Sequence, residues 1–247
     1  MGSTPAAASY PAITRLRLRL LGRFELSSDN RPLSVRPTGE RLLAYLAVTP
    51  ELVTRQEAAA ALWPDCTDAR AAANLRSALC RLPGRQQGGV IRSSAGGISL
   101  MPGMSIDVDE ISSSLTRASD IGDEVSIPTL RQDLLPGWPE HWLIPARERF
   151  RQVRLRALDA LCDQHRAAGR LSCALDAALA AVGCDPLRES AHRRLTLIHI
   201  AEGNFAEALR QYHIYRKLAA SELGLPPSPH FRKLISPLLG RPADETA

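Results

Sequence analysis

Residues 54–83 read TRQEAAAALWPDCTDARAAANLRSALCRLP, and this stretch decides the fold of the first half of the chain. It opens on TRQE, a capping-box pattern in which the first and fourth side chains satisfy each other's backbone amides at the start of a helix. Pro64 stops that helix, and a second one is predicted over 68–82, where Pro83 ends it. The apolar stripe of the second helix is expected to consist of Ala72, Leu75, Leu79 and Leu82. The stretch therefore predicts two helices joined by a short turn.

Short strands and one further helix precede this pair of helices. Residues 16–20 read LRLRL, an alternation of period two that is typical of a strand with one buried face. A turn at Asp29-Asn30 leads into a second short strand at 32–35. Beyond it the period becomes helical, and Thr38 is placed to cap a helix that carries Leu42, Leu43 and Leu46 on one face.

A β-hairpin is predicted after the two helices. Residues 90–94 and 98–101 are short strand-like runs joined across Ala95-Gly96-Gly97. The order is therefore strands, three helices and a hairpin. This is the plan of a winged helix-turn-helix whose sheet precedes as well as follows the helices.

The helix at 68–82 carries the main functional hypothesis. If its leucines face the core, the opposite face presents Arg70, Asn74, Ser77 and Arg81, and Arg76 lies on the flank. Arginine and asparagine are the side chains that read guanine and adenine edges bidentately in the major groove. In the hairpin, Arg92 fits a wing that touches phosphate or the minor groove. The alternatives are an ordinary solvated helix face and an ordinary exposed hairpin, but the predicted winged-helix setting favours contact with DNA.

The second half of the chain is predicted to be helical. Two short helices are expected within 108–132 and a long one over 145–168. The run GRLSCAL at 169–175 then reappears as GNFAEAL at 203–209, which is 34 residues later. A 34-residue period with Gly between paired helices and a small Ala after it is the tetratricopeptide signature. We expect two such repeats, capped by the preceding helices and by 229–239.

The charge divides unevenly between the two halves. Residues 1–106 hold 13 Arg and 7 acidic residues, a balance of +6, whereas residues 107–247 hold 18 Lys plus Arg and 19 acidic residues, a balance of −1. All basic residues of the first part are Arg, which suits bidentate contacts to phosphate or guanine better than Lys does. This asymmetry favours a nucleic-acid or other acidic partner for the N-terminal part.

The long helix carries a basic face of its own. Arg147, Arg151 and Arg154 share one side of it. We interpret this side as a solvated or salt-bridged surface, and contact with phosphate or with a partner is the alternative.

The sequence offers no case for an enzyme, a metal site or a cofactor. The five Cys are odd in number and never spaced as CxxC, and the six His form no HExxH pattern, so we expect neither a disulfide frame nor a metal site. No glycine pair is followed by GK[ST], and there is no GxSxG, so no cofactor and no catalytic residues are expected. No apolar run approaches the roughly 18 residues needed to span a bilayer, and the first eleven residues do not form a secretion signal. We expect a cytoplasmic protein that does not associate with membranes.

The chain resembles the Streptomyces antibiotic regulatory proteins. In the N-terminal half, the resemblance lies in LWPD at 62–65 and ANLRSALCRL at 73–82, which are similar to the segment from the second to the third helix of that family. In the C-terminal half, the similar runs are LLPGW at 134–138, Trp142, RER at 147–149, DPLRESAH at 185–192, Gly203, ALRQY at 208–212 and LGLP at 223–226. The later runs resemble the family's bacterial transcriptional activation domain, and the resemblance covers about 16–238.

The resemblance implies an OmpR-type winged helix in an activator of a secondary-metabolite (antibiotic) gene cluster. Such proteins bind double-stranded DNA at direct repeats near a promoter, with a homodimer on DNA as one arrangement, and recruit RNA polymerase holoenzyme through its sigma factor. The turn at 64–67 is where the family would meet polymerase, which makes Asp65 and Thr67 candidate contacts. This chain departs from the family at Arg81-Leu82-Pro83, where another Arg is usual, so the recognition helix loses one basic residue and stops about a turn early.

We therefore expect a mainly α chain with a small β component. The expected parts are a disordered tail at 1–14, an OmpR-type winged helix-turn-helix DNA-binding domain at 15–106, an all-α tetratricopeptide-like activation domain at 107–240 and a tail at 241–247. The expected function is sequence-specific activation of transcription. The alternative is a tetratricopeptide-type protein-interaction module whose winged helix no longer binds DNA.

Overall fold

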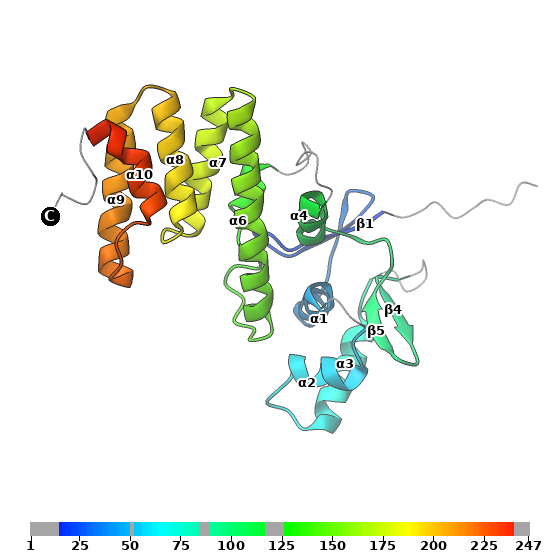
Figure 1. The fold of residues 1–247 in the computed structure, drawn as a ribbon. Coiled ribbons are helices and arrows are strands. Elements are labelled where there is room, and N and C mark those ends of the chain that lie inside the picture. Colours follow the sequence, from blue (N-terminus) through cyan, green and yellow to red (C-terminus); the bar gives the residue numbers. More distant parts are fainter. Residues whose placement is uncertain (1–14, 50–51, 84–88, 117–125, 240–247) are drawn as a thin grey trace, which may run out of the picture. The chain divides into compact units, whose positions relative to one another are not determined.

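The computed structural model describes residues 15–49, 52–83, 89–116 and 126–239 (Figure 1). The tails predicted at 1–14 and 241–247 lie outside these described residues. The chain divides into two compact units, the first comprising the residues up to Asp109 together with Leu135–Leu143, and the second comprising Glu110–Leu134 together with the residues from Ile144 onward. Within the described part, no helix combines the length and the apolar character that a membrane crossing requires.

A four-stranded sheet forms one part of the first unit. Its strands lie in the order β3-β2-β1-β6, with bounds β1 Leu16–Arg19, β2 Glu25–Ser28, β3 Arg31–Leu33 and β6 Ser105–Ile106. Asp29 and Asn30 have φ of 49° and 62°, the pair of positive values that a tight type I′ hairpin turn requires, so the predicted turn is confirmed. Sequence analysis missed β6, which pairs parallel to β1 through Arg17 and Ser105.

Asp107 follows β6 directly and closes the end of β1. Its buried carboxylate accepts hydrogen bonds from the amides of Leu20 (3.0 Å), Leu21 (2.9 Å) and Val108 (2.9 Å). Burial raises the pKa of Asp107, and these amide donors oppose the rise. The residue thus ties the start of α4 (Asp107–Thr116) to the strand that opens the fold.

Helix α1 (Pro37–Val48) buries the apolar face that its sequence predicts, with Leu42 and Leu43 fully buried. The predicted cap at Thr38 is wrong, because the N-cap is Arg36 and Pro37 begins the helix. Proline has no N–H to be capped and its fixed φ suits the first helical position, so the helix starts two residues before a Thr38 cap would allow.

Helices α2 (Arg55–Leu62) and α3 (Asp68–Cys80) form the predicted helix-turn-helix. The capping box is confirmed, since the amide of Glu57 donates to Thr54 Oγ1 (3.2 Å) and the amide of Thr54 donates to the Glu57 carboxylate (2.9 Å). Figure 1 shows α2 and α3 lying side by side beneath α1.

The predicted hairpin is confirmed as β4 (Ile91–Ser94) and β5 (Gly97–Leu100). Val53, between α1 and α2, forms an isolated antiparallel β-bridge with Ile98 of β5. Its N–H and C=O exchange hydrogen bonds with Ile98 at 3.2 and 2.8 Å. Gly97 makes this approach possible, since a Cβ at that position would lie 2.2 Å from the Val53 oxygen. The hairpin is therefore fixed to the residues that immediately precede α2.

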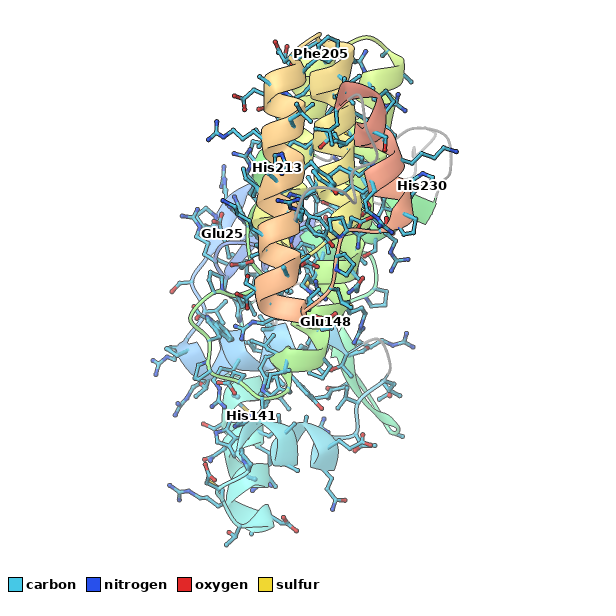
Figure 2. All side chains as sticks on the ribbon, turned by 60° about the vertical axis from the view of Figure 1, so that its left-hand side comes forward. Glu25, His141, Glu148, Phe205, His213 and His230 are labelled. Carbon is cyan, nitrogen blue, oxygen red and sulfur yellow. The ribbon has the colours of Figure 1, made fainter. Side chains whose placement is uncertain are left out.

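The second unit is all helical. Its main helices are α6 (Leu143–Ala167, in this unit from Ile144), α7 (Leu171–Cys184), α8 (Glu189–Ala201), α9 (Phe205–Leu223) and α10 (Pro229–Leu239), and a short α5 (Ile127–Leu130) precedes them. Figure 2 shows Phe205 and His213 along α9, with His230 on the neighbouring α10. Two aromatic side chains of α9, Tyr212 and Tyr215, pack with Phe231 and Ile235 of α10, as expected of a capping helix.

The 34-residue repeat is confirmed by equivalent backbone geometry at Gly169 and Gly203. The two glycines have φ of 71° and 75°, and their amides donate to Arg166 and Ile200, both at 3.0 Å. The small residues five positions later, Ala174 and Ala208, are both fully buried. Glycine is needed here because the left-handed backbone that turns one helix into the next disfavours a Cβ.

A buried histidine links the two helices of the second repeat. His192 on α8 is 1% exposed, and its Nε2 lies 2.8 Å from the carbonyl oxygen of Pro186 while Nδ1 is bonded to the side-chain amide of Gln211. These partners fit a neutral ring that donates from Nε2 and accepts at Nδ1. Burial lowers the pKa of His192. The histidine is therefore a structural residue.

Candidate nucleic-acid interface

The buried face of α3 differs from the predicted stripe at two of its four residues, each by one position. The residues that α3 and the turn after it bury are Ala71, Leu75, Ala78 and Leu82. The predicted Ala72 and Leu79 are only half-buried. Small alanines allow the neighbouring helices to approach closely, and at about 100° per residue this shift turns Arg76 and Cys80 toward solvent.

The predicted DNA-contact residues separate into two groups. Arg70, Arg76 and Arg81 are exposed, whereas Asn74 and Ser77 are half-buried. Arg92 is exposed on β4. The predicted contacts that reach the surface are therefore all guanidinium groups.

The end of α3 needs a correction. The recognition helix was predicted over 68–82, but it ends at Cys80, and Arg81 is its C-cap with φ of −100° and ψ of 2°. Pro83 is the physical reason, because it cannot donate to the helix and it disfavours helical geometry in the residue before it. Arg81 therefore projects from the turn after the helix.

Arg55 was missed by sequence analysis. It is the first residue of α2, and together with Arg76 it lines two hollows. One hollow, of about 290 Å³, lies between α2 and α3 over Ala59 and Ala72, and the other, of about 250 Å³, lies between α3 and the hairpin over Leu79. A cation in the first turn opposes the helix dipole, which was the signal in the sequence that this residue serves another purpose.

These arginines carry no ion pair within the part of the chain that the structure describes. Arg55 makes one long hydrogen bond to Ser93 Oγ on the hairpin (3.4 Å), and no bonded partner is found among the described residues for the other members of the group, Arg70, Arg76, Arg81 and Arg92. Five guanidinium groups from α2, α3, the following turn and β4 thus face solvent without an ion pair to any described acid, although Asp68 lines the α2–α3 hollow with Arg55 and Arg76. Such a surface attracts a polyanion.

The arginines of α6 are used differently. Arg151 pairs with Asp185 (2.6 Å) and with Glu148, and Arg154 pairs with Asp133 (2.9 Å). The Nε–H of Arg147 donates to the Leu134 carbonyl (3.1 Å). These contacts favour the salt-bridged interpretation of the basic helix over contact with phosphate.

The turn between α2 and α3 presents the candidate polymerase contacts. Asp65 and Thr67 are both exposed, and Thr67 is the N-cap residue of α3 although its side chain makes no capping hydrogen bond. The turn is closed by a hydrogen bond from the amide of Cys66 to the carbonyl of Trp63 (3.1 Å). Both side chains are therefore available to a partner.

No cluster of three metal-ligating side chains is found in the described ranges. Burial raises the pKa of Cys162 to about 11, and Cys184 is shifted in the same direction for the same reason. Both thiols belong to the second unit.

Comparison with known proteins finds a family match for the second half of the chain. The family model described as the bacterial transcriptional activator domain matches residues 129–239. The chain carries a bacterial transcriptional activator domain. The curated relatives include the regulatory protein AfsR of Streptomyces coelicolor, 27% identical over 239 residues, and that of Streptomyces griseus, 27% identical over 265 residues. The alignments cover 91% and 99% of this chain but only 24% and 27% of the relatives, so the chain spans about a quarter of their length.

A solved structure with a similar fold extends the match to the N-terminal unit. Mycobacterium tuberculosis EmbR, in complex with a low affinity phosphopeptide, aligns with a TM-score of 0.74 at 20% identity, over 93% of this chain and 66% of the EmbR chain. This likeness concerns the fold and covers most of the residues of both units. The activator-domain match and the AfsR relatives support the family predicted from the sequence, the Streptomyces antibiotic regulatory proteins.

Proposed function

We propose that this chain is a sequence-specific DNA-binding transcriptional activator, not an enzyme, that acts in the cytoplasm. The observation that carries the proposal is the group of five exposed arginines that form no ion pair with the described residues, presented by α2, α3, the turn after it and the hairpin. The activator domain and the AfsR relatives supply the regulatory context.

Four of the five arginines have a role that their position supports. Arg70 and Arg76 lie on the exposed face of α3 and would read guanine edges in the major groove. Asn74 and Ser77 are half-buried, so they contribute only if the base edges come close to the helix axis. Arg55 and Arg92, on the elements either side of α3, would bind backbone phosphates and fix the register.

The same fold offers a place for the transcription machinery. We propose that Asp65 and Thr67 in the α2–α3 turn contact RNA polymerase holoenzyme, including its sigma factor. Two copies of the chain would occupy direct repeats near a promoter, and the genes controlled would form a secondary-metabolite cluster. The exposure of both side chains supports the polymerase role, and the family resemblance supports the rest.

A binding scan tests the proposal. Promoter fragments from the genes that flank this one are incubated with the full chain at several salt concentrations. We expect one fragment to be retained, with an affinity that falls steeply with salt because each phosphate contact displaces about one counterion. If no fragment is retained even in dilute buffer, the proposal fails and the protein-interaction module becomes the better interpretation.

A further inference from the structure

A short segment that belongs to the activator domain by family match is built into the winged-helix unit. The matched region begins at residue 129, yet residues 135–143 group with the first unit. Leu135 is fully buried and its amide donates to the carbonyl of Leu20 (2.9 Å), while the Trp138 ring stacks on Phe24 with 6.2 Å between centroids. We call residues 135–143 the strap.

The backbone of the strap is held in an unfavourable conformation. Leu135 has φ of 44°, a left-handed value that branched side chains rarely adopt. Such a conformation persists only where the surrounding contacts over-determine it. The docked position of the strap is therefore specific.

Glu140 is the polar centre of the strap. Its carboxylate accepts two hydrogen bonds from Arg41 of α1, from Nε at 2.8 Å and from Nη2 at 3.0 Å, and a third from Trp142 Nε1 at 3.1 Å. Trp142 in turn meets Tyr45 of α1 edge-on, at 5.3 Å between centroids. A bidentate arginine–carboxylate pair has a fixed geometry, so Glu140 determines where the Arg41 guanidinium points.

Arg41 also contacts the helix-turn-helix, at the end of α2. Its Nη2 also donates to the carbonyl of Leu62 at 2.8 Å, and Leu62 is the last residue of α2. Carbonyls in the last turn of a helix have no partner within the helix, so an external donor fixes that end. The turn at 63–67 and then α3 follow directly.

We propose that Glu140 is a positioning residue for DNA recognition. Through Arg41 it fixes the C-terminal end of α2, and thereby the turn from which α3 and its arginines start. The activator-domain sequence thus sets the geometry of the recognition helix. This inference rests on the proposed function, and it deepens that function by naming a residue outside the winged-helix sequence on which recognition depends.

The test compares three full-length variants on the fragment that the wild-type chain retains. Glu140→Gln places an amide NH₂ where Arg41 and Trp142 need an acceptor, so we expect an affinity about tenfold lower. Amide hydrogen exchange at 63–67 should become faster in the same variant. Glu148→Gln, the same chemical change at an exposed site on α6 (Figure 2), should alter neither quantity.

The charge swap Arg41→Glu with Glu140→Arg distinguishes a residue that positions the end of α2 from one that only holds the strap on α1. It restores an ion pair between α1 and the strap, but Glu at position 41 cannot donate to the Leu62 carbonyl. We expect Glu140→Gln to lower the thermal midpoint of unfolding and the swap to recover it. The swap should recover neither the affinity for DNA nor the slow amide exchange at 63–67.

The outcomes decide the inference independently of the proposed function. Wild-type affinity and exchange in Glu140→Gln would overturn the inference, and so would a swap that restores both. If the wild-type chain itself retains no DNA, the proposed function fails, and exchange at 63–67 in the free protein still shows whether Glu140 holds the turn.

Discussion

Gly97→Ala is the substitution that most directly probes how the hairpin is attached to the helix-turn-helix. An added Cβ would lie 2.2 Å from the Val53 oxygen and 2.8 Å from its carbonyl carbon, both backbone atoms that cannot rotate away. The hairpin must therefore separate from Val53, which breaks the two hydrogen bonds between Val53 and Ile98. Gly97 also has φ of 150°, which a residue with a Cβ adopts only under strain.

The expected cost follows from these contacts. Two backbone hydrogen bonds are worth about 1 kcal/mol each, and the strained backbone adds about 1 kcal/mol. We expect the free energy of unfolding of the first unit to fall by about 3 kcal/mol. Gly103→Ala is the matched control, because Gly103 also has a positive φ of 84° but a Cβ there meets nothing within 4 Å, so only the backbone term of about 1 kcal/mol applies.

Tryptophan fluorescence in urea measures this unit selectively. All three tryptophans of the chain, Trp63, Trp138 and Trp142, belong to the first unit. The DNA affinity of Gly97→Ala should fall as well, because Arg92 and Ser93 move with the hairpin. Equal midpoints for Gly97→Ala and Gly103→Ala would refute the argument that contact with Val53 fixes the hairpin.

Three further predictions concern recognition, activation and pH. Arg55→Ala should weaken binding to all DNA sequences alike and reduce the salt slope by about one, whereas Arg76→Ala should cost about 1–3 kcal/mol on the preferred sequence and relax specificity; competition titrations at several salt concentrations distinguish the two. Asp65→Ala should leave the gel shift unchanged and lower transcript yield with purified polymerase, and equal yields would remove the α2–α3 turn as the contact. Because burial lowers the folded-state pKa of His192 below its ordinary 6.5, the unfolded chain binds that proton first, so stability should fall as pH drops below about 6.5. Unfolding followed by circular dichroism should show a smaller slope in His192→Gln, where His213, whose pKa burial also lowers, still contributes, and an unchanged slope in His230→Gln.

Local signals in the sequence were enough to predict most elements. The TRQE capping box, the Asp29-Asn30 turn and the glycines of the 34-residue repeat each specify backbone geometry within a few residues, and the structure has all of them. Such motifs satisfy their own backbone groups, so they do not depend on distant parts of the chain.

The features that were missed depend on long-range contacts. Strand β6 is two residues long and exists because it pairs with β1, a partner that no local period reveals. On α3 and the turn after it, Leu75 and Leu82 are buried as predicted, but Ala71 and Ala78 are buried in place of Ala72 and Leu79. Apolar residues are adjacent at both places, and only the neighbouring helices decide which of them is buried. Arg55 was missed because its relevance comes from Arg76 and Ser93, which are distant in sequence.

The contacts of the strap predict that the winged-helix unit needs residues 135–143 for its full stability, although its sequence pattern ends near residue 106. A fragment of residues 15–109 lacks Leu135, whose burial is worth about 2 kcal/mol, and it loses the two aromatic pairs of Trp138 and Trp142, at about 0.5–1.5 kcal/mol each. It also leaves Arg41 without its carboxylate partner. The sum, about 3–5 kcal/mol, is a large part of the 5–15 kcal/mol that typically stabilises a domain, so residues 15–143 should unfold in urea at a clearly higher midpoint than residues 15–109 when both are followed by circular dichroism. Equal midpoints would mean that the strap rests on a unit already complete without it, and the dependence of α3 on Glu140 would then lose its physical basis.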